Sequence, residues 1–132
     1  MPPTKSATLT EAELRLMEVL WAKGSSTVQQ VVDALPADAP LAYNSVLTTI
    51  RILEKKGYVE HEKDGRAHIF KPVVAREDAA RSEIRNLVRR MFGNSHELLV
   101  LNVLEEEQID LAELRRLREL LKQEDDETTK DR

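Results

Sequence analysis

The fold is decided by residues 41–71, which read LAYNSVLTTIRILEKKGYVEHEKDGRAHIFK. Within this stretch, Val46, Ile50 and Leu53 recur at the i, i+4, i+7 spacing that places side chains on one buried face of a helix. Gly57 suits the left-handed position that commonly ends a helix. The stretch therefore predicts a helix that stops at Gly57 and runs directly into residues of strand character.

The face of this helix opposite the buried residues is mostly polar. Small hydroxyls, an amide and cations suit the floor of a DNA groove and its phosphates. The candidate DNA contacts of the helix are Tyr43, Asn44, Ser45, Thr48, Thr49, Arg51 and Lys55, and Ile52 shares their face. Two alternatives stay open: the face could simply be solvated, and Tyr43 could cap the core instead of stacking on a sugar or phosphate.

Two stretches of strand character, residues 58–63 and 66–71, flank an Asp-Gly pair that accepts the positive φ angles of a type I′ turn. This turn would place Lys63 opposite Arg66 at the tip of a hairpin. A cationic tip beside a polar helix face would grip a duplex at two points. We therefore predict a wing and add Lys63, Arg66 and His68 to the candidate DNA contacts.

The same pairing would set His61 opposite His68 across the hairpin. Two facing imidazoles could share a metal ion, but the sequence offers no third ligand nearby. Phosphate contact or partial packing is the favoured interpretation, and we predict neither a metal nor a cofactor. A protonatable pair could also make binding sensitive to pH.

Two further helices precede this stretch. Thr10 with Glu13 has the spacing of a capping box, and a stripe of Leu14, Met17, Leu20 and Trp21 follows it. A second box, Ser26 with Gln29, begins another short helix, at whose N-terminus Ser26 and Thr27 could donate to a phosphate. Three helices and a two-stranded wing predict a mainly α winged helix-turn-helix domain over residues 8–74.

The second half predicts a helical dimerisation arm over residues 75–123. Six of the seven residues in 98–104 are apolar, and a helix that is apolar on every side needs cover that a small domain cannot supply. A second copy of the chain is the economical source of that cover. The candidate dimerisation residues are Met91, Leu98, Leu101, Leu104, Leu114, Leu117 and Leu121. Residues 124–132 are polar and predicted to form a disordered acidic tail.

Composition restricts the function. The chain has 132 residues, a net charge of −4 and no cysteine, which excludes disulfides and thiolate chemistry. Its three histidines are dispersed and no glycine-rich phosphate loop is present, so we predict that it is not an enzyme. The sequence shows neither a signal peptide nor an apolar run of membrane-spanning length, which predicts a cytoplasmic protein without membrane insertion.

The charge is unevenly distributed. Residues 1–74 hold nine basic and nine acidic side chains, and residues 75–132 hold eleven and fifteen. Within 41–71 the balance is only +2, a weak electrostatic footprint for a DNA-binding protein. This leaves a rival interpretation, a winged-helix module that binds protein and never DNA, and it predicts modest affinity for DNA unless two copies act together.

The combination of AYNSVLTTIRILEKKGYVEHEKDGRAHIF with LLVLNVLEEEQIDLAELRRLRELL resembles the BlaI/MecI family of penicillinase and methicillin-resistance repressors. The resemblance covers about residues 10–123. It implies a homodimeric transcriptional repressor whose winged helices bind a palindromic operator and whose C-terminal helices intertwine.

The resemblance also implies a route to inactivation. In β-lactam-responsive members of the family, a membrane sensor with a zinc protease domain leads to cleavage after the Asn of the LVLN helix. That bond corresponds here to Asn102–Val103, where the best-known members have Phe on the far side. A lone Asn in an apolar helix also sets the register of a dimer core, and this is an alternative role for Asn102.

Overall fold

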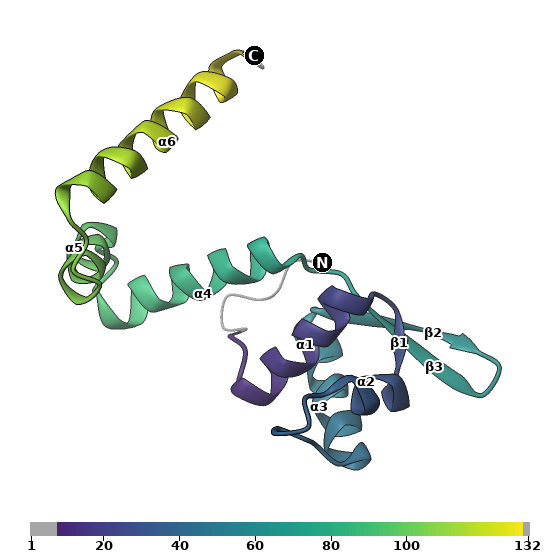
Figure 1. The fold of residues 1–132 in the computed structure, drawn as a ribbon. Helices are drawn as coiled ribbons and strands as arrows, with labels where there is room; N and C mark the ends of the chain where they lie inside the picture. The colour runs from purple at the N-terminus through teal and green to yellow at the C-terminus, as the bar shows by residue number, and fades with distance from the viewer. Residues whose placement is uncertain (1–7, 131–132) are drawn as a thin grey trace. The chain divides into compact units, whose positions relative to one another are not determined.

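The computed structural model describes residues 8–130, with side chains described through Asp125. Its helices and strands follow one another in the order α1 (Glu11–Lys23), β1 (Ser26–Thr27), α2 (Val28–Ala34), α3 (Tyr43–Lys56), β2 (Val59–Asp64), β3 (Ala67–Pro72), α4 (Arg76–Met91), α5 (His96–Glu106) and α6 (Leu111–Lys130). The chain divides into two compact units between Arg90 and Met91. The predicted mainly α fold with a winged helix-turn-helix is confirmed (Figure 1).

The core of the first unit joins the three N-terminal helices to the root of the hairpin. Val46, Ile50 and Leu53 of α3 are fully buried, as their spacing predicts. From α1 the buried apolar residues are Leu16, Met17 and Leu20. Leu14, predicted for this stripe, is only partly buried. The buried stripe keeps Met17 and Leu20 and includes Leu16 in place of Leu14.

The wing belongs to a three-stranded sheet of order β1-β3-β2, where two strands were predicted. The extra strand is only two residues long, and Ser26 and Thr27 pair with Phe70 and Ile69. A strand this short has no periodicity that a sequence pattern could show. It fastens the start of α2 to the root of the hairpin, which Figure 1 shows projecting beyond the helices.

The helix ends largely follow the sequence signals. Thr10 and Glu13 form the predicted capping box of α1, and Gly57 ends α3 with a φ of 87°. The second capping box lies one residue later than predicted, because it is Thr27 and its N3 residue, Gln30, that exchange the two hydrogen bonds. Ser26 is taken into β1 instead.

The first unit extends beyond residue 74, where the sequence placed the end of the winged-helix domain. The Trp21 indole N–H donates to the Val74 carbonyl at 2.9 Å, and the Arg76 guanidinium lies 4.7 Å from the centre of the Trp21 ring. Further along α4, the Glu83 carboxylate accepts from the Leu9 backbone N–H at 2.7 Å. These contacts join α4 to α1 and to the residues that precede it.

The second unit contains α5 and α6. Ser95 caps α5 by accepting from the Leu98 N–H, and Asp110 caps α6 by accepting from the Glu113 N–H. Helix α6 continues to Lys130, so residues 124–130 are helical and the prediction of a disordered tail is wrong there; residues 131–132 lie outside the described residues. Once an amphipathic helix is nucleated, each further residue adds a hydrogen bond at low cost, even where the sequence is polar.

Candidate nucleic-acid interface

Helix α3 turns a polar face to solvent on the side opposite its buried residues. Asn44, Ser45, Thr48, Arg51 and Lys55 are all exposed. Since their positions lie within about one third of the helix circumference at about 100° per residue, they form one continuous surface. The surface carries an amide, two hydroxyls and two cations, and it begins at the first turn of the helix.

The two remaining candidates of this helix differ in how far their side chains are held by other contacts. The Thr49 hydroxyl donates to the Ser45 carbonyl at 2.7 Å, and Thr49 is partly buried, so its side chain is held against its own helix. Tyr43 is 46% exposed and lies in the first turn of α3. It therefore remains available to a ligand, although nothing in the sequence distinguished this from a place in the core.

The start of α2 is less accessible than the sequence suggested. Ser26 is 1% exposed and its hydroxyl donates to the Gly24 carbonyl at 3.2 Å, so its prediction as a phosphate contact is wrong. The reason is its place in β1, the edge strand of the sheet, where it pairs with Phe70. Thr27 is partly buried and its hydroxyl accepts from the Gln30 N–H at 3.2 Å.

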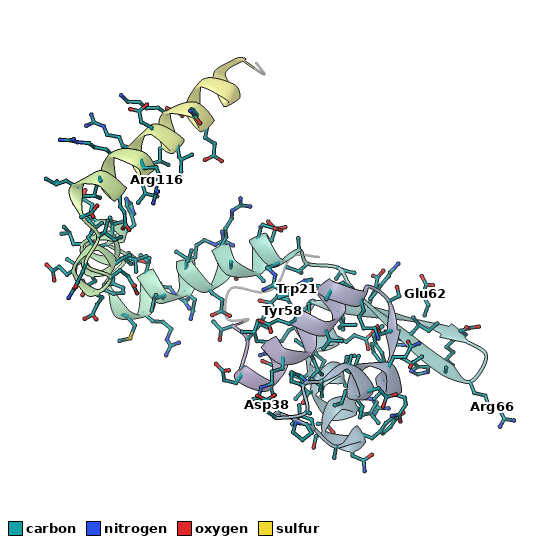
Figure 2. The ribbon with its side chains drawn as sticks, in the orientation of Figure 1. Trp21, Asp38, Tyr58, Glu62, Arg66 and Arg116 are labelled. Atoms are coloured by element: carbon teal, nitrogen blue, oxygen red, sulfur yellow. The ribbon has the colours of Figure 1, made fainter. Side chains whose placement is uncertain are left out.

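The hairpin turn differs from the prediction. Asp64 pairs with Ala67, which makes Gly65 and Arg66 the two central residues of the turn. Gly65 has a φ of +64° while Arg66 keeps a negative φ, the pattern of a type II′ turn rather than type I′. Glycine alone takes the strained position, so Asp64 can stay in the strand. Arg66 is therefore at the very tip of the wing, where Figure 2 shows it pointing away from the domain.

The two faces of the wing carry opposite charges. On one face Lys63 pairs in register with His68, and this pair lies next to the turn that carries Arg66. On the other face Lys71 is held by two carboxylates, at 3.2 Å from Glu60 and 3.4 Å from Glu62. Hydrogen bonds to these two carboxylates raise the pKa of Lys71 above its usual range. Only the Lys63 face therefore presents a lysine that no carboxylate holds.

His61 connects the wing to α3. It pairs with Phe70 in the ladder, so the predicted pairing with His68 is wrong by two residues. The shift keeps both histidines on one face, where their rings stack with centroids 4.7 Å apart. The His61 Nδ1 also lies 2.5 Å from the Glu54 carboxylate of α3. Within residues 8–125, no group of three or more His, Cys, Asp or Glu side chains is arranged to hold a metal ion.

The cations differ in how far they are committed to other contacts. Lys56, at the end of α3, donates at 2.8 Å both to the Glu13 carboxylate and to the Thr8 carbonyl. Burial of Glu13 opposes its ionisation, but the hydrogen bonds from Lys56 and the Thr10 N–H outweigh burial and hold the pKa of Glu13 below its ordinary value. Among the residues that the structure describes, no ion pair involves Arg51, Lys55, Lys63 or Arg66. These four cations are free for phosphate.

The predicted dimerisation residues leave an apolar surface uncovered in the single chain. Helix α5 has no buried residue, and Leu101 is 55% exposed. Met91, Leu98, Leu117 and Leu121 are also exposed, whereas Leu104 and Leu114 are partly buried. Exposed leucines in this number on a small protein are unusual, because burying each one is worth about 1.5–3 kcal/mol.

The predicted cleavage position lies within α5. Asn102 is exposed, and its side-chain amide donates to the Leu98 carbonyl at 2.9 Å. Val103 is 43% exposed. The Asn102–Val103 peptide bond is therefore in the middle of a helix, and a protease could bind it in an extended form only after local unwinding.

A model of the penicillinase repressor family matches residues 9–123 of the chain, which includes both the α3 surface and the apolar C-terminal helices. The chain belongs to the penicillinase repressor family. The penicillinase repressor of Bacillus licheniformis is 26% identical over 115 residues, which cover 87% of this chain and 90% of that protein. The methicillin resistance regulatory protein MecI of Staphylococcus aureus is 23% identical over 117 residues, covering 89% and 95%.

A third relative is more similar over a shorter stretch. The transcriptional regulator BlaI of Mycobacterium tuberculosis is 39% identical over 75 residues, 56% of this chain and 54% of that protein. Among solved structures, the DNA-binding domain of the repressor BlaI has 27% identity and a TM-score of 0.49, and covers 59% of this chain and 90% of that domain. The penicillinase repressor family consists of transcriptional repressors and not of enzymes, as the sequence predicts.

No helix within residues 8–130 is long and apolar enough to cross a membrane. The sequence missed three features of the site: the β1 strand, the type II′ register of the turn and the hydrogen bond between His61 and Glu54. The first depends on pairing between residues far apart in the sequence, and the second depends on the register of the hairpin. The Glu54 and His61 spacing offered no signal, because the two residues lie on different elements.

Proposed function

We propose that this chain is a homodimeric, sequence-specific DNA-binding repressor that acts in the cytoplasm on a palindromic operator. The observation that carries the proposal is the exposed polar face of α3 beside a wing whose Lys63 and Arg66 are free of carboxylate partners. Membership of a repressor family supports the same function.

The proposed reading surface is the solvent face of α3, inserted in the major groove. The Asn44 amide can make a paired contact to adenine, and the Ser45 and Thr48 hydroxyls can bond to base edges. Arg51 and Lys55 would then reach the phosphates that border the groove. Tyr43, Thr49 and Thr27 complete the proposed surface of this helix and its neighbour.

The wing supplies the second contact. Arg66 at its tip and Lys63 with His68 on its cationic face would bind backbone phosphate, while the face with Glu60 and Glu62 must point away from DNA. The contact between the His61 ring and the Glu54 carboxylate holds the root of the wing against α3. This contact limits the freedom of the wing relative to the reading surface, so both can meet one half-site together.

Two observations support the proposed dimerisation. The apolar residues of α5 and α6 lack cover in the single chain. The reading domain also has a small charge excess, so one copy would bind DNA weakly. Two weak contacts joined in one dimer act at high effective concentration, and overall affinity can then exceed that of one half-site by 10²- to 10⁴-fold.

Binding to a palindrome compared with one half-site tests the proposal. The full chain should be used to select double-stranded sequences from a random library, and the dissociation constants for the selected palindrome and its half-site should be measured. We expect the palindrome to bind at least about 100-fold more tightly. Equal affinities would contradict the dimeric mode, and failure to enrich any sequence would contradict DNA reading altogether.

We further propose that cleavage of the Asn102–Val103 bond, initiated by a membrane-bound sensor metalloprotease, releases the repressor from DNA. Cleavage there would separate the last four residues of α5 and all of α6 from the reading domain. It would so remove four of the seven proposed dimerisation residues, which are Leu104, Leu114, Leu117 and Leu121. Mass spectrometry of the protein from host cells treated with a β-lactam should find fragments that end at Asn102 and begin at Val103. An intact chain under inducing conditions would contradict this route.

A protein-interaction module is the second candidate, and the carboxylates of Glu60 and Glu62 on the wing favour it. Salt separates the two functions. Affinity for DNA should fall steeply as salt rises, because bound cations are released from the duplex, whereas an apolar protein interface is insensitive to salt.

A further inference from the structure

Ile52 is an apolar residue on the polar face of α3. It is 42% exposed, and it lies one turn after Thr48 on the same side of the helix. It belongs neither to the buried core nor to the partly buried apolar residues packed against that core. Its exposed apolar surface is therefore available to a ligand, among side chains that are otherwise polar.

The chemistry of an isoleucine limits what that ligand can be. It has no hydrogen-bond donor or acceptor, so it can satisfy neither a phosphate oxygen nor the polar edge of a base. In the major groove the C5-methyl group of thymine is the apolar feature that distinguishes one base pair from the others. Arg51 and Lys55 are already suited to the phosphates, which leaves Ile52 with the groove floor.

We propose that Ile52 is a specificity-determining residue that contacts the C5-methyl group of a thymine in the operator half-site. This inference rests on the proposed function, because it requires α3 to lie in the major groove. Thr48 and Ser45 lie within one to two turns of Ile52 on the same face of α3, so the recognised thymine would neighbour a base that is read through hydrogen bonds.

The expected effect follows from the size of one methyl group. Removing a single buried methyl from an apolar contact lowers affinity by about fourfold, which is ~0.8 kcal/mol converted at 1.4 kcal/mol per tenfold. A contact to a phosphate or a sugar would show no dependence on this methyl group. The effect is thus small but chemically specific.

The experiment uses DNA that differs only in that methyl group. After an operator has been selected with the full wild-type chain, each thymine is replaced in turn by deoxyuridine, and dissociation constants are measured for the wild type and for Ile52→Ala. We expect one thymine of each half-site at which the wild type loses about fourfold per methyl on deoxyuridine, while Ile52→Ala binds both DNAs equally. Ile52→Val should fall between them.

Val73→Ala is the matched control, because Val73 is also β-branched, is 41% exposed and lies outside α3. It should preserve the wild-type preference for thymine over deoxyuridine. The inference is overturned if no thymine shows the effect, or if the preference survives in Ile52→Ala. In either case sequence-selective binding by the wild type would still stand. If the wild type selects no sequence, the proposed function itself fails, and the inference with it.

Discussion

In the winged-helix unit, Leu16, Met17 and Leu20 have no exposed surface, whereas α5 has no buried residue although six of its central seven residues are apolar. Both regions are built from amphipathic or apolar helices with well-formed caps. The difference is that the helices of the first unit pack around a shared core, whereas the two helices of the second unit leave an apolar surface uncovered. The first unit thus buries its own apolar residues, whereas the second unit leaves its apolar residues exposed.

The comparison explains how a protein with little basic charge could bind DNA. The winged-helix unit supplies geometry, with a polar helix face and a cationic wing tip, but its charge excess over residues 41–71 is only +2. The C-terminal unit supplies exposed leucines that favour pairing with a second chain. The proposed affinity arises from their combination.

Charged residues on the apolar surface of α5 and α6 should have the largest effect, on both dimerisation and affinity for DNA. The double variant Leu101→Asp with Leu117→Asp would bury two unpaired carboxylates in the proposed interface, and we expect monomers whose affinity for the palindrome is 10²- to 10⁴-fold lower. Analytical ultracentrifugation and fluorescence anisotropy measure the two effects. Affinity for one half-site should not change.

Gln123→Asp is the control for one added carboxylate, because it places that charge at a polar, exposed position of α6. It should remain dimeric. A double variant that stays dimeric would show that α5 and α6 do not form the interface.

Truncating one apolar side chain in each unit should lower the free energy of unfolding in both, but only in the second unit should the loss depend on protein concentration. We expect Leu20→Ala to lower the free energy of unfolding by about 2–5 kcal/mol, because it leaves a cavity in a fully buried cluster. Urea unfolding followed by the fluorescence of Trp21, the single tryptophan, should show the same loss at low and high protein concentration. For Leu101→Ala, which lies in the other unit and is followed by helical circular dichroism, the loss should depend on concentration. The same concentration dependence for both variants would contradict the assignment of the core to the first unit and of the dimer interface to the second.

Acid should weaken the link between α1 and α3. The pKa of Glu13 is lowered in the folded protein from its ordinary value of 4.5, so the stability that Glu13 provides is fully present above that value and is lost as the pH falls through the folded pKa. Chemical denaturation at several pH values below 4.5 should show this decline. Glu13→Gln should make it shallower; an unchanged slope would mean that Lys56 does not favour the ionised form.

Wing cations should give the smallest effect. Arg66→Ala removes one proposed phosphate contact, and we expect the slope of log affinity against log salt to fall by about 1 for each half-site, with similar losses on all sequences. Lys71→Ala is the matched control, since Lys71 is held by Glu60 and Glu62. An equal loss of slope in both variants would show that the charge of the wing acts diffusely.

The local features of the fold could be predicted because each depends on residues close in sequence. Val46, Ile50 and Leu53 reveal their shared face by spacing alone, and the capping box of Thr10 and Glu13 spans a single turn. Gly57 marks its own position because other residues rarely adopt its backbone conformation. The solvent face of α3 followed from the same geometry, which is why most of its candidate contacts are exposed.

The wrong predictions concern positions whose structure is decided by pairing between strands. Ser26 looked like a helix cap until its pairing with Phe70 drew it into a strand and buried it. The turn of the wing depends on the register between β2 and β3, and both Asp64-Gly65 and Gly65-Arg66 are acceptable central pairs locally. The choice between them is made by the whole ladder and by the burial of Val59 and Phe70 at its root.

The sequence by itself determined the helices, their caps and the apolar character of residues 98–104, because helical periodicity and capping are properties of neighbouring residues. Tertiary structure alone decided which cations are free. Lys56 and Lys71 are as basic in sequence as Lys55 and Lys63, but folding brings Glu13 to the first and Glu60 with Glu62 to the second. The choice of which charges can reach a phosphate is made by pairs formed across the fold, and such pairs leave no trace in local sequence.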